Sequence, residues 1–258
     1  MLSFKLEKKL RSLGLKSGDK ILVTSDVLKF LINLKKKKTK FSLNSLIDIL
    51  IKIVGKKGNI LLPTFNWDFC KGKNYNYISS KSMTGALSNI ALKRKDFARS
   101  KNPIYSFAVI GKDKNYVCSL KHASCFGLDS PFGYLIKNKA KNLCIGMDYK
   151  DGFTFVHVAE EKVGVNYRFH KNYSGYSTYK KEKKIFGSYK MYVRDLSMNV
   201  ETKINKKLDK LMSKRKAIKK ESFLGVPITL LNIATAYNFM VKDLKNGGNL
   251  IYPKKIKI

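Results

Sequence analysis

The stretch DKILVTSDVLKFLINL (residues 19–34) joins an uninterrupted apolar run to apolar positions at helical spacing. Its first part, DKILVTS (19–25), predicts a buried strand. Its second part, VLKFLINL (27–34), predicts a helix with Ser25 and Asp26 as candidate caps. A strand of continuous apolar residues is typical of a sheet that is covered on both faces. The stretch therefore predicts one β–α unit of an α/β protein.

The same alternation of short apolar runs and amphipathic segments extends along the chain. Further strands are expected at 59–65, 105–111 and 141–147. Helices are expected at 6–15, 42–55, 84–96, 202–218 and 228–244. Residues 166–200, rich in Tyr, Ser and Gly, predict a loop and an added antiparallel strand region near 180–200. We therefore predict one α/β domain over residues 1–258, a three-layer α/β/α sandwich with a mostly parallel central sheet.

Length and composition exclude several classes of protein. The 258 residues, 44% hydrophobic, can bury one large core. No apolar run approaches the roughly 18 residues of a membrane span, and lysines interrupt the N-terminal segment, unlike a signal peptide. We therefore expect a cytoplasmic protein. Its four cysteines show no C-x-x-C spacing, which predicts free thiols and no metal site.

The formal net charge of +35 indicates an anionic partner. Only six of the 53 basic residues are arginine, and the lysines are scattered through almost every surface segment. Proteins that read bases or clamp phosphates favour the bidentate fork of arginine. We therefore expect no nucleic-acid partner, and a field that favours small acidic ligands such as phosphate-bearing molecules.

The stretch TFVHVAEEKVG (154–164) contains the pattern T-x-x-H-x-x-E. If Thr154 caps a helix, His157 falls in its first turn and Glu160 lies one turn later on the same face. The helix N-terminus disfavours an imidazolium, whereas the carboxylate stabilises it and fixes the ring tautomer. Two interpretations remain open for His157: a general base, or a buried polar group bonded to a backbone carbonyl.

Seven segments carry a family resemblance: GDKILVTSDVL, NILLPTF, TGALSN, RSKNPIYSFAVIG, SPFGYL, LCIGM and TFVHVAEE. They occur in the order and rough spacing of the aminoglycoside 3-N-acetyltransferase family, which the chain resembles from about residue 15 to residue 165. The resemblance implies an acetyl-CoA-dependent N-acetyltransferase. In it His157 is the catalytic base, and Glu160 is its partner or a contact to the substrate amine. Glu161 is expected to be a surface acid, His122 to lie in a loop near the site and His170 on the surface.

The co-substrate acetyl-CoA is expected at two places. A strand-to-helix turn exposes N–H groups that can receive a phosphate, and an available strand edge suits the amides of the pantetheine arm. The family resemblance points to such a turn and to the strand after R-S-x-x-P-x-x-S. The alternatives are an ordinary N-cap and packing at a helix start. The expected cofactor contacts are Ser25, Asp26, Val27, Thr84, Ser106, Ala108 and Val109.

The segment TFNWDF (64–69) follows a predicted strand and supplies the expected substrate contacts. Ligands of open α/β sheets bind beyond the carboxyl ends of the strands. Trp67 can stack on a base or sugar face, or pack in the core or a lid, and Asp68 can hold the acceptor amine. The expected substrate-binding residues are Thr64, Asn66, Trp67 and Asp68.

Three departures from the family pattern bear on the acceptor. Thr24 stands where family members usually carry His, Asn89 where they carry Glu, and Asn102 where they carry His. A lost acid and a strongly basic chain disfavour a polycationic acceptor. We therefore predict direct acetyl transfer from acetyl-CoA to a nucleotide-linked amino sugar of surface polysaccharide synthesis. The alternatives are an aminoglycoside resistance enzyme and a non-catalytic basic nucleic-acid-binding protein. A homo-oligomer is compatible with the sequence.

Overall fold

A seven-stranded mixed sheet forms the centre of the computed structural model, which describes residues 2–179, 184–248 and 250–255. The strand order is β10-β11-β6-β1-β2-β5-β4. The central strands β6, β1 and β2 are parallel, and the strands on both flanks join antiparallel. The strands are β1 (Lys20–Ser25), β2 (Asn59–Pro63), β4 (Ala98–Arg99), β5 (Phe107–Gly111), β6 (Lys141–Ile145), β10 (Ile218–Phe223) and β11 (Val226–Asn232).

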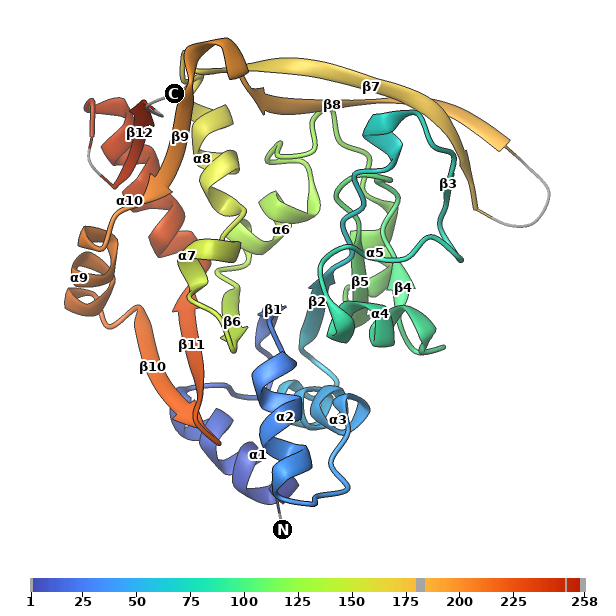
Figure 1. Cartoon of the computed structure of the whole chain (residues 1–258), viewed down its shortest axis with the longest axis vertical. Helices are drawn as coiled ribbons and strands as arrows, with labels where there is room; N and C mark the ends of the chain where they lie inside the picture. Colours follow the sequence, from blue (N-terminus) through green and yellow to red (C-terminus); the bar gives the residue numbers. More distant parts are fainter. Residues whose placement is uncertain (1, 180–183, 249, 256–258) are drawn as a thin grey trace.

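Helices cover both faces of this sheet, which confirms the predicted three-layer α/β/α class (Figure 1). In β1, Ile21 and Val23 belong to one apolar core and Leu22 belongs to the other. This alternation explains why the strand reads as continuously apolar. One face is covered by α1 (Leu2–Leu13), α2 (Leu28–Lys36), α3 (Leu43–Val54) and α4 (Ala86–Lys93). The other is covered by α5 (Lys114–Ser119), α6 (Pro131–Lys137), α8 (Phe155–Val163) and α10 (Ile233–Lys245).

A long hairpin extends away from the main sheet and crosses the top of the molecule in Figure 1. It consists of β7 (Arg168–Thr178) and β8 (Lys184–Arg194), paired antiparallel from Arg168↔Arg194 to Thr178↔Lys184. The short β3 (Tyr75–Asn76) adds to β7. The hairpin corresponds to the antiparallel strand region expected near 180–200. Residues 180–183 lie outside the residues that the structure describes. The remaining elements are η1 (Phe69–Lys71), α7 (Tyr149–Gly152), η2 (Leu196–Met198), β9 (Val200–Ile204), α9 (Lys207–Lys214) and β12 (Ile251–Lys255).

Two helix predictions near the C-terminus were wrong in their extent. Residues 202–218 hold only the short helix α9, between strands β9 and β10. Lys216 has a left-handed φ of 51°, which stops that helix. Residues 228–232 belong to β11, which pairs with β6, and α10 begins only after Asn232 caps it through Thr235 N. In both places tertiary strand pairing overrides the helical periodicity of the sequence.

The carboxyl ends of the three parallel strands lie at one edge of the sheet, and the candidate site lies beyond that edge. Strand β1 leads through a turn into α2, and β6 leads through α7 into α8. The two turns touch, because a β-carbon at Gly146 would collide with the carbonyl oxygen of Asp26. Among the described residues, no helix is long and apolar enough to cross a membrane. The assignment of residues 1–258 to one domain stays a prediction.

Candidate active site

His157 and Glu160 face each other one turn apart on α8. The imidazole Nδ1 lies 2.8 Å from Glu160 Oε2. Thr154 occupies the N-cap position as expected, but its side chain makes no capping hydrogen bond, and its carbonyl instead accepts from His157 N. The helix spacing alone therefore brings the two side chains together, as the sequence predicts.

The carboxylate of Glu160 is fully buried and has two further partners. Its Oε2 lies 2.7 Å from Arg168 Nε, at the first residue of β7, and its Oε1 accepts a hydrogen bond from the Tyr167 hydroxyl at 3.1 Å. Burial raises the pKa of Tyr167, and the neighbouring carboxylate raises it further, so this phenol stays a donor. Sequence reasoning missed both residues. One signal was available, because arginine is rare in this lysine-rich chain.

The side chain of His157 also borders a cavity. With Nδ1 on the carboxylate, Nε2 is the ring nitrogen free to accept a proton. The side chain is 27% exposed, and it lines a cavity of about 530 Å³. The lining residues are Lys150, Asp151, Gly152, Phe153, Thr154, Val156, His157, Lys203 and Ile204. The imidazole can therefore exchange a proton with a ligand in this cavity.

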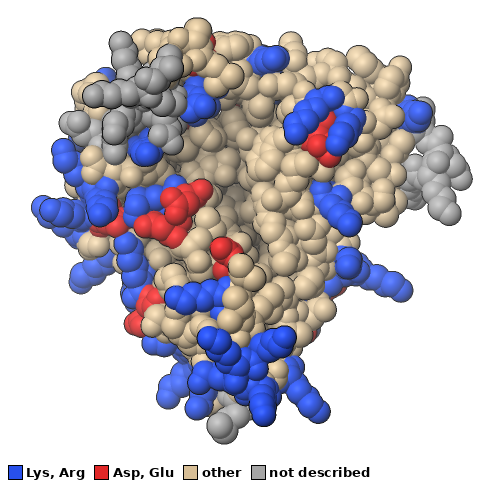
Figure 2. Space-filling model, viewed as in Figure 1, with Lys and Arg blue, Asp and Glu red and all other residues tan. Residues whose placement is uncertain are grey.

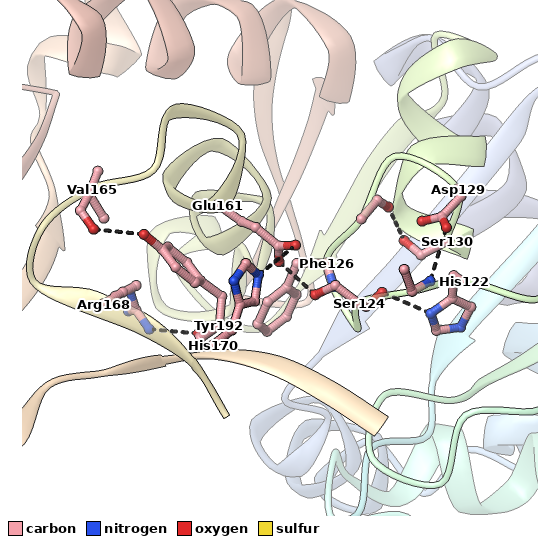
Figure 3. A network of polar contacts seen from close by, with 12 residues as sticks. His122, Ser124, Phe126, Asp129, Ser130, Glu161, Val165, Arg168, His170 and Tyr192 are labelled. Carbon is pink, nitrogen blue, oxygen red and sulfur yellow. Dashed lines mark hydrogen bonds and ion pairs between the residues drawn. The ribbon is translucent and has the colours of Figure 1, made fainter. Parts of the chain in front are cut away.

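A loop beside the imidazole holds Phe126, whose ring centroid lies 5.3 Å from that of His157. Ser124 in this loop donates from Oγ to Glu161 Oε2 at 2.8 Å, and Glu161 Oε1 lies 3.3 Å from His170 Nε2 (Figure 3). The prediction that Glu161 is an ordinary surface acid was wrong, because its side chain is only 14% exposed and is held by two partners. The loop is thereby fixed against α8 and β7.

Figure 3 shows the other two histidines on either side of this contact, His170 beside Glu161 and His122 beside Ser124. His170 is exposed, as expected, although it pairs with Glu161. The Nδ1 atom of His122 lies 2.8 Å from the carbonyl oxygen of Ser124, so His122 does sit in a loop near the site. Burial lowers the pKa of His122 and favours its neutral form.

The predicted phosphate turn lies at the carboxyl edge of the sheet. Asp26 is exposed, and its Oδ1 accepts from Leu28 N at 3.0 Å, while Asp26 N donates to Ile145 O. Ser25 is partly exposed and Val27 is buried. Thr84 donates to the carbonyl of Pro63 at the end of β2. These residues gather at the edge where a ligand is expected, and their role in cofactor binding stays a prediction.

The second group of predicted cofactor contacts lies inside the sheet. Ser106, Ala108 and Val109 have no exposed surface. Strand β5 is paired with β2 on one side and with β4 on the other, so the strand edge expected for the pantetheine arm is already occupied. The Oγ atom of Ser106 is bonded to Thr64 and Arg99. The geometry thus offers a ligand no surface on these three side chains.

The four predicted substrate contacts are divided between core and surface. Thr64 is fully buried. Asn66 and Asp68 line a cavity of about 220 Å³, and Asp68 pairs with Lys73 at 3.2 Å. Trp67 is 38% exposed and belongs to a row of aromatic rings that leads to His157. Successive ring centroids in the row Trp67, Tyr105, Phe126 and His157 lie 6.3, 4.7 and 5.3 Å apart. Substrate binding by these residues stays a prediction.

At the three positions that depart from the family pattern, each side chain makes polar contacts with nearby groups of the protein. Thr24 Oγ1 lies 2.9 Å from Cys144 Sγ. Asn89 bonds the backbone of Ser82 through both ends of its amide. Asn102 Oδ1 accepts from two backbone N–H groups of the following turn. Each of these side chains therefore has a structural role in its own loop or strand.

The four cysteines are unsuited to nucleophilic attack. Burial raises the pKa of Cys70 and of Cys118 to about 11. Burial likewise raises the pKa of Cys125 and of Cys144 to about 12. A thiol must lose its proton to become a nucleophile, so these groups are almost entirely inactive near neutral pH. The raised pKa values therefore disfavour an acyl-enzyme route through a cysteine.

Known proteins share both sequence and fold with this chain. The sequence model of the aminoglycoside 3-N-acetyltransferase family matches residues 33–245. The crystal structure of aminoglycoside acetyltransferase AAC(3)-Xa is 17% identical, covers 96% of this chain and 94% of that chain, and has a TM-score of 0.79. Sisomicin-bound AAC-VIa is 18% identical in sequence, and its structure aligns over 96% of this chain and 99% of that chain with a TM-score of 0.78. AAC-IIIb with CoASH is 17% identical in sequence, and its structure aligns over 96% of this chain and 98% of that chain with a TM-score of 0.75. No curated protein sequence matches the chain.

The predicted nucleotide-linked amino sugar was wrong, because the family match supports the alternative of an aminoglycoside enzyme. The argument from net charge failed because charge acts locally. Figure 2 shows most basic side chains gathered around the α1–α3 end and the α9–β10 flank, whereas the central hollow is bordered mainly by uncharged side chains, with acidic as well as basic ones at its rim. The general substrate class, a small amino sugar, is confirmed, as are the acetyl-CoA-dependent N-acetyltransferase class and its co-substrate. The chain belongs to the aminoglycoside 3-N-acetyltransferase family.

Proposed function

We propose that the protein transfers an acetyl group from acetyl-CoA to the 3-amino group of an aminoglycoside. One observation carries the proposal: His157, held through Nδ1 by the buried Glu160, lines an open cavity with its remaining ring nitrogen available. Membership of the family supports the choice of acceptor. Among the neighbours, AAC-VIa was solved with sisomicin and AAC-IIIb with CoASH.

The chemistry assigned to the side chains is proton transfer. Acetyl-CoA, when bound, supplies the thioester carbonyl at which the amine nitrogen forms its new bond while the carbon–sulfur bond breaks. His157 accepts the proton that the nitrogen loses, and returns it to the leaving thiolate or to water. Glu160 fixes the tautomer with the proton on Nδ1 and stabilises the imidazolium that forms. Both substrates must be bound together, because no acyl-enzyme is formed.

The test is the release of free CoA by the purified protein, followed with a thiol reagent. With acetyl-CoA and sisomicin or gentamicin we expect turnover and a product heavier by one acetyl group, located on the 3-amino nitrogen by NMR. A dTDP-linked amino sugar serves as the control acceptor, and we expect no turnover with it. Release of CoA with the nucleotide sugar, and none with either antibiotic, would overturn the proposal.

A further inference from the structure

The helix α8 and the strand β7 are joined by two adjacent acid–base pairs. Glu160 pairs with Arg168, and the next residue, Glu161, pairs with His170. Arg168 and His170 are two residues apart, so they point to the same side of β7. The start of the hairpin is also fixed by the Tyr192 hydroxyl, which donates to Val165 O at 2.6 Å (Figure 3). The position of Arg168 beside α8 is therefore determined by several independent contacts.

One oxygen of Glu160 serves both the imidazole and the guanidinium. Oε2 lies 2.8 Å from His157 Nδ1 and 2.7 Å from Arg168 Nε. The carboxylate has no exposed surface, and the Arg168 side chain is almost buried as well. A buried carboxylate is costly unless a cation compensates it, and charges interact strongly where water is excluded. Without the guanidinium, the same carboxylate would attract a proton onto the His157–Glu160 pair.

We propose that Arg168 is a positioning residue of the transferase reaction, which keeps His157 unprotonated by neutralising the carboxylate that the two side chains share. The proposal rests on the proposed function, in which His157 is the base. A base that already carries a proton at neutral pH cannot accept one from the amine. Arg168 thus sets the pH range in which the enzyme works, although it is not one of the residues that line the cavity.

Other charged and titratable groups lie around the cavity of His157 and around Glu160. Helix α7 contributes Lys150 and Asp151, and β9 contributes Lys203, all on the lining of the cavity. Tyr167 faces the same carboxylate from the segment before β7. Replacing Arg168 alters none of these side chains, although it also removes the hydrogen bond from Arg168 Nη1 to Tyr192 O. A shift in the titration of His157 can therefore be assigned to the guanidinium.

The variants isolate the charge of Arg168. Arg168→Gln removes the charge and keeps a hydrogen-bond donor, and Arg168→Lys keeps the charge. Arg194→Gln is the matched control, because Arg194 is the cross-strand partner of Arg168 in the hairpin and has no contact with Glu160. In Arg168→Gln, the acid limb of the kcat/KM profile should move to higher pH by on the order of one unit, as expected for the loss of a neighbouring opposite charge. Arg168→Lys should restore most of the shift, and Arg194→Gln should match the wild-type profile.

A second measurement does not depend on activity. The chain has only three histidines, so the ring signals can be assigned by NMR with His157→Gln. The midpoint of the His157 titration, measured without substrates, should rise in Arg168→Gln, fall in Glu160→Gln, and return near the wild-type value in the double variant. Coincident midpoints in folded wild-type protein and Arg168→Gln would overturn the proposal. If Arg168→Gln does not fold, the midpoint of Glu160→Gln must still lie below that of the double variant.

These outcomes separate the two proposals. Wild-type protein that releases no CoA with any aminoglycoside would refute the proposed function, whereas the NMR titration would still decide the role of Arg168. An active wild-type enzyme with an unshifted profile in Arg168→Gln would refute the role of Arg168 alone.

Discussion

The side chains of two arginines, Arg99 and Arg168, are largely buried, and they differ in what they contact. Arg168 is paired with a carboxylate, Glu160. Arg99 on β4 contacts only neutral oxygens: it donates to Ser106 Oγ at 3.0 Å and to the carbonyls of Thr64 and Ser80. Its guanidinium also lies 4.9 Å from the ring centroid of Tyr75. Burial lowers the pKa of Arg99, as expected for a cation with little compensation.

The difference shows which kind of buried cation serves a site. Arg99 joins the end of β2, the segment at Ser80 and the start of β5, and it lines a separate cavity of about 340 Å³. None of these hydrogen bonds leads to His157. The partner of Arg168 continues to His157 and from there to an open cavity. Burial and hydrogen bonding are common to both arginines, so they do not mark function. The connection to the proposed catalytic base does.

The sharpest test of this comparison is His157→Gln, which should have the largest effect. Glutamine can keep a hydrogen bond to Glu160 but cannot accept the proton of the amine. General base catalysis contributes about 10²- to 10⁴-fold, so kcat should fall by roughly 10³. The affinity for CoA and the Tm should change little. His170→Gln, in the neighbouring pair, should retain most of its activity, and equal losses in both variants would contradict the distinction.

Arg99→Met should show the opposite pattern, a loss of stability without a specific loss of catalysis. The substitution leaves the Thr64 and Ser80 carbonyls and Ser106 Oγ without their donor. We expect the free energy of unfolding to fall by about 3 kcal/mol, measured by urea denaturation. The kcat of the folded fraction should stay within about twofold, since Arg99 contacts neither His157 nor Glu160.

The control for this variant is Arg94→Met. Arg94 pairs with Asp48 and Asp96 at the surface, and these carboxylates are largely exposed. Its loss should cost less than about 1 kcal/mol. If Arg99→Met were as stable as the wild type but much slower, Arg99 would belong to the site, and the contrast with Arg168 would disappear.

Tyr167→Phe tests the contribution of the second partner of Glu160, the carboxylate that pairs with Arg168. The variant removes one of the hydrogen bonds to the buried carboxylate and keeps the ion pair with Arg168. A hydrogen bond to a charged group is worth about 1.5 to 3 kcal/mol, part of which a neighbouring water can replace. We therefore expect kcat/KM to fall by about tenfold. Tyr192→Phe, which loses a bond to the carbonyl of Val165, should affect stability rather than kcat.

The sequence predicted those parts of the fold and site that depend on local patterns. The β1–α2 unit follows from an apolar run and a helical repeat, and the pairing of His157 with Glu160 follows from their spacing on one helix. The segments near 202–218 and 228–232 failed because their conformation depends on distant strands with which they pair. Helical periodicity in a short segment cannot reveal such a partner.

The contacts of Arg168 and Tyr167 could not be predicted for the same reason. They require α8 to end at Gly164, whose left-handed φ of 72° turns the chain so that β7 begins beside the helix it has just left. The burial of Ser106, Ala108 and Val109 also depends on β4, a two-residue strand without a pattern of its own. The choice of acceptor failed because net charge says nothing about where the charges lie.

The smallest expected effect concerns His122, which supports the loop of Phe126 and has no place in the proton transfer. Burial lowers its pKa in the folded protein, so the unfolded chain binds a proton more readily. Stability should therefore be complete above the unfolded value of about 6.5 and should decrease as the pH falls below it. His122→Asn removes this dependence. Between about pH 7.5 and about pH 5.5, the wild type should lose up to about 1 kcal/mol more than the variant in urea denaturation. Parallel pH dependences would show that the neutral His122 is not what holds this loop, and would leave Ser124 and Glu161 as its support.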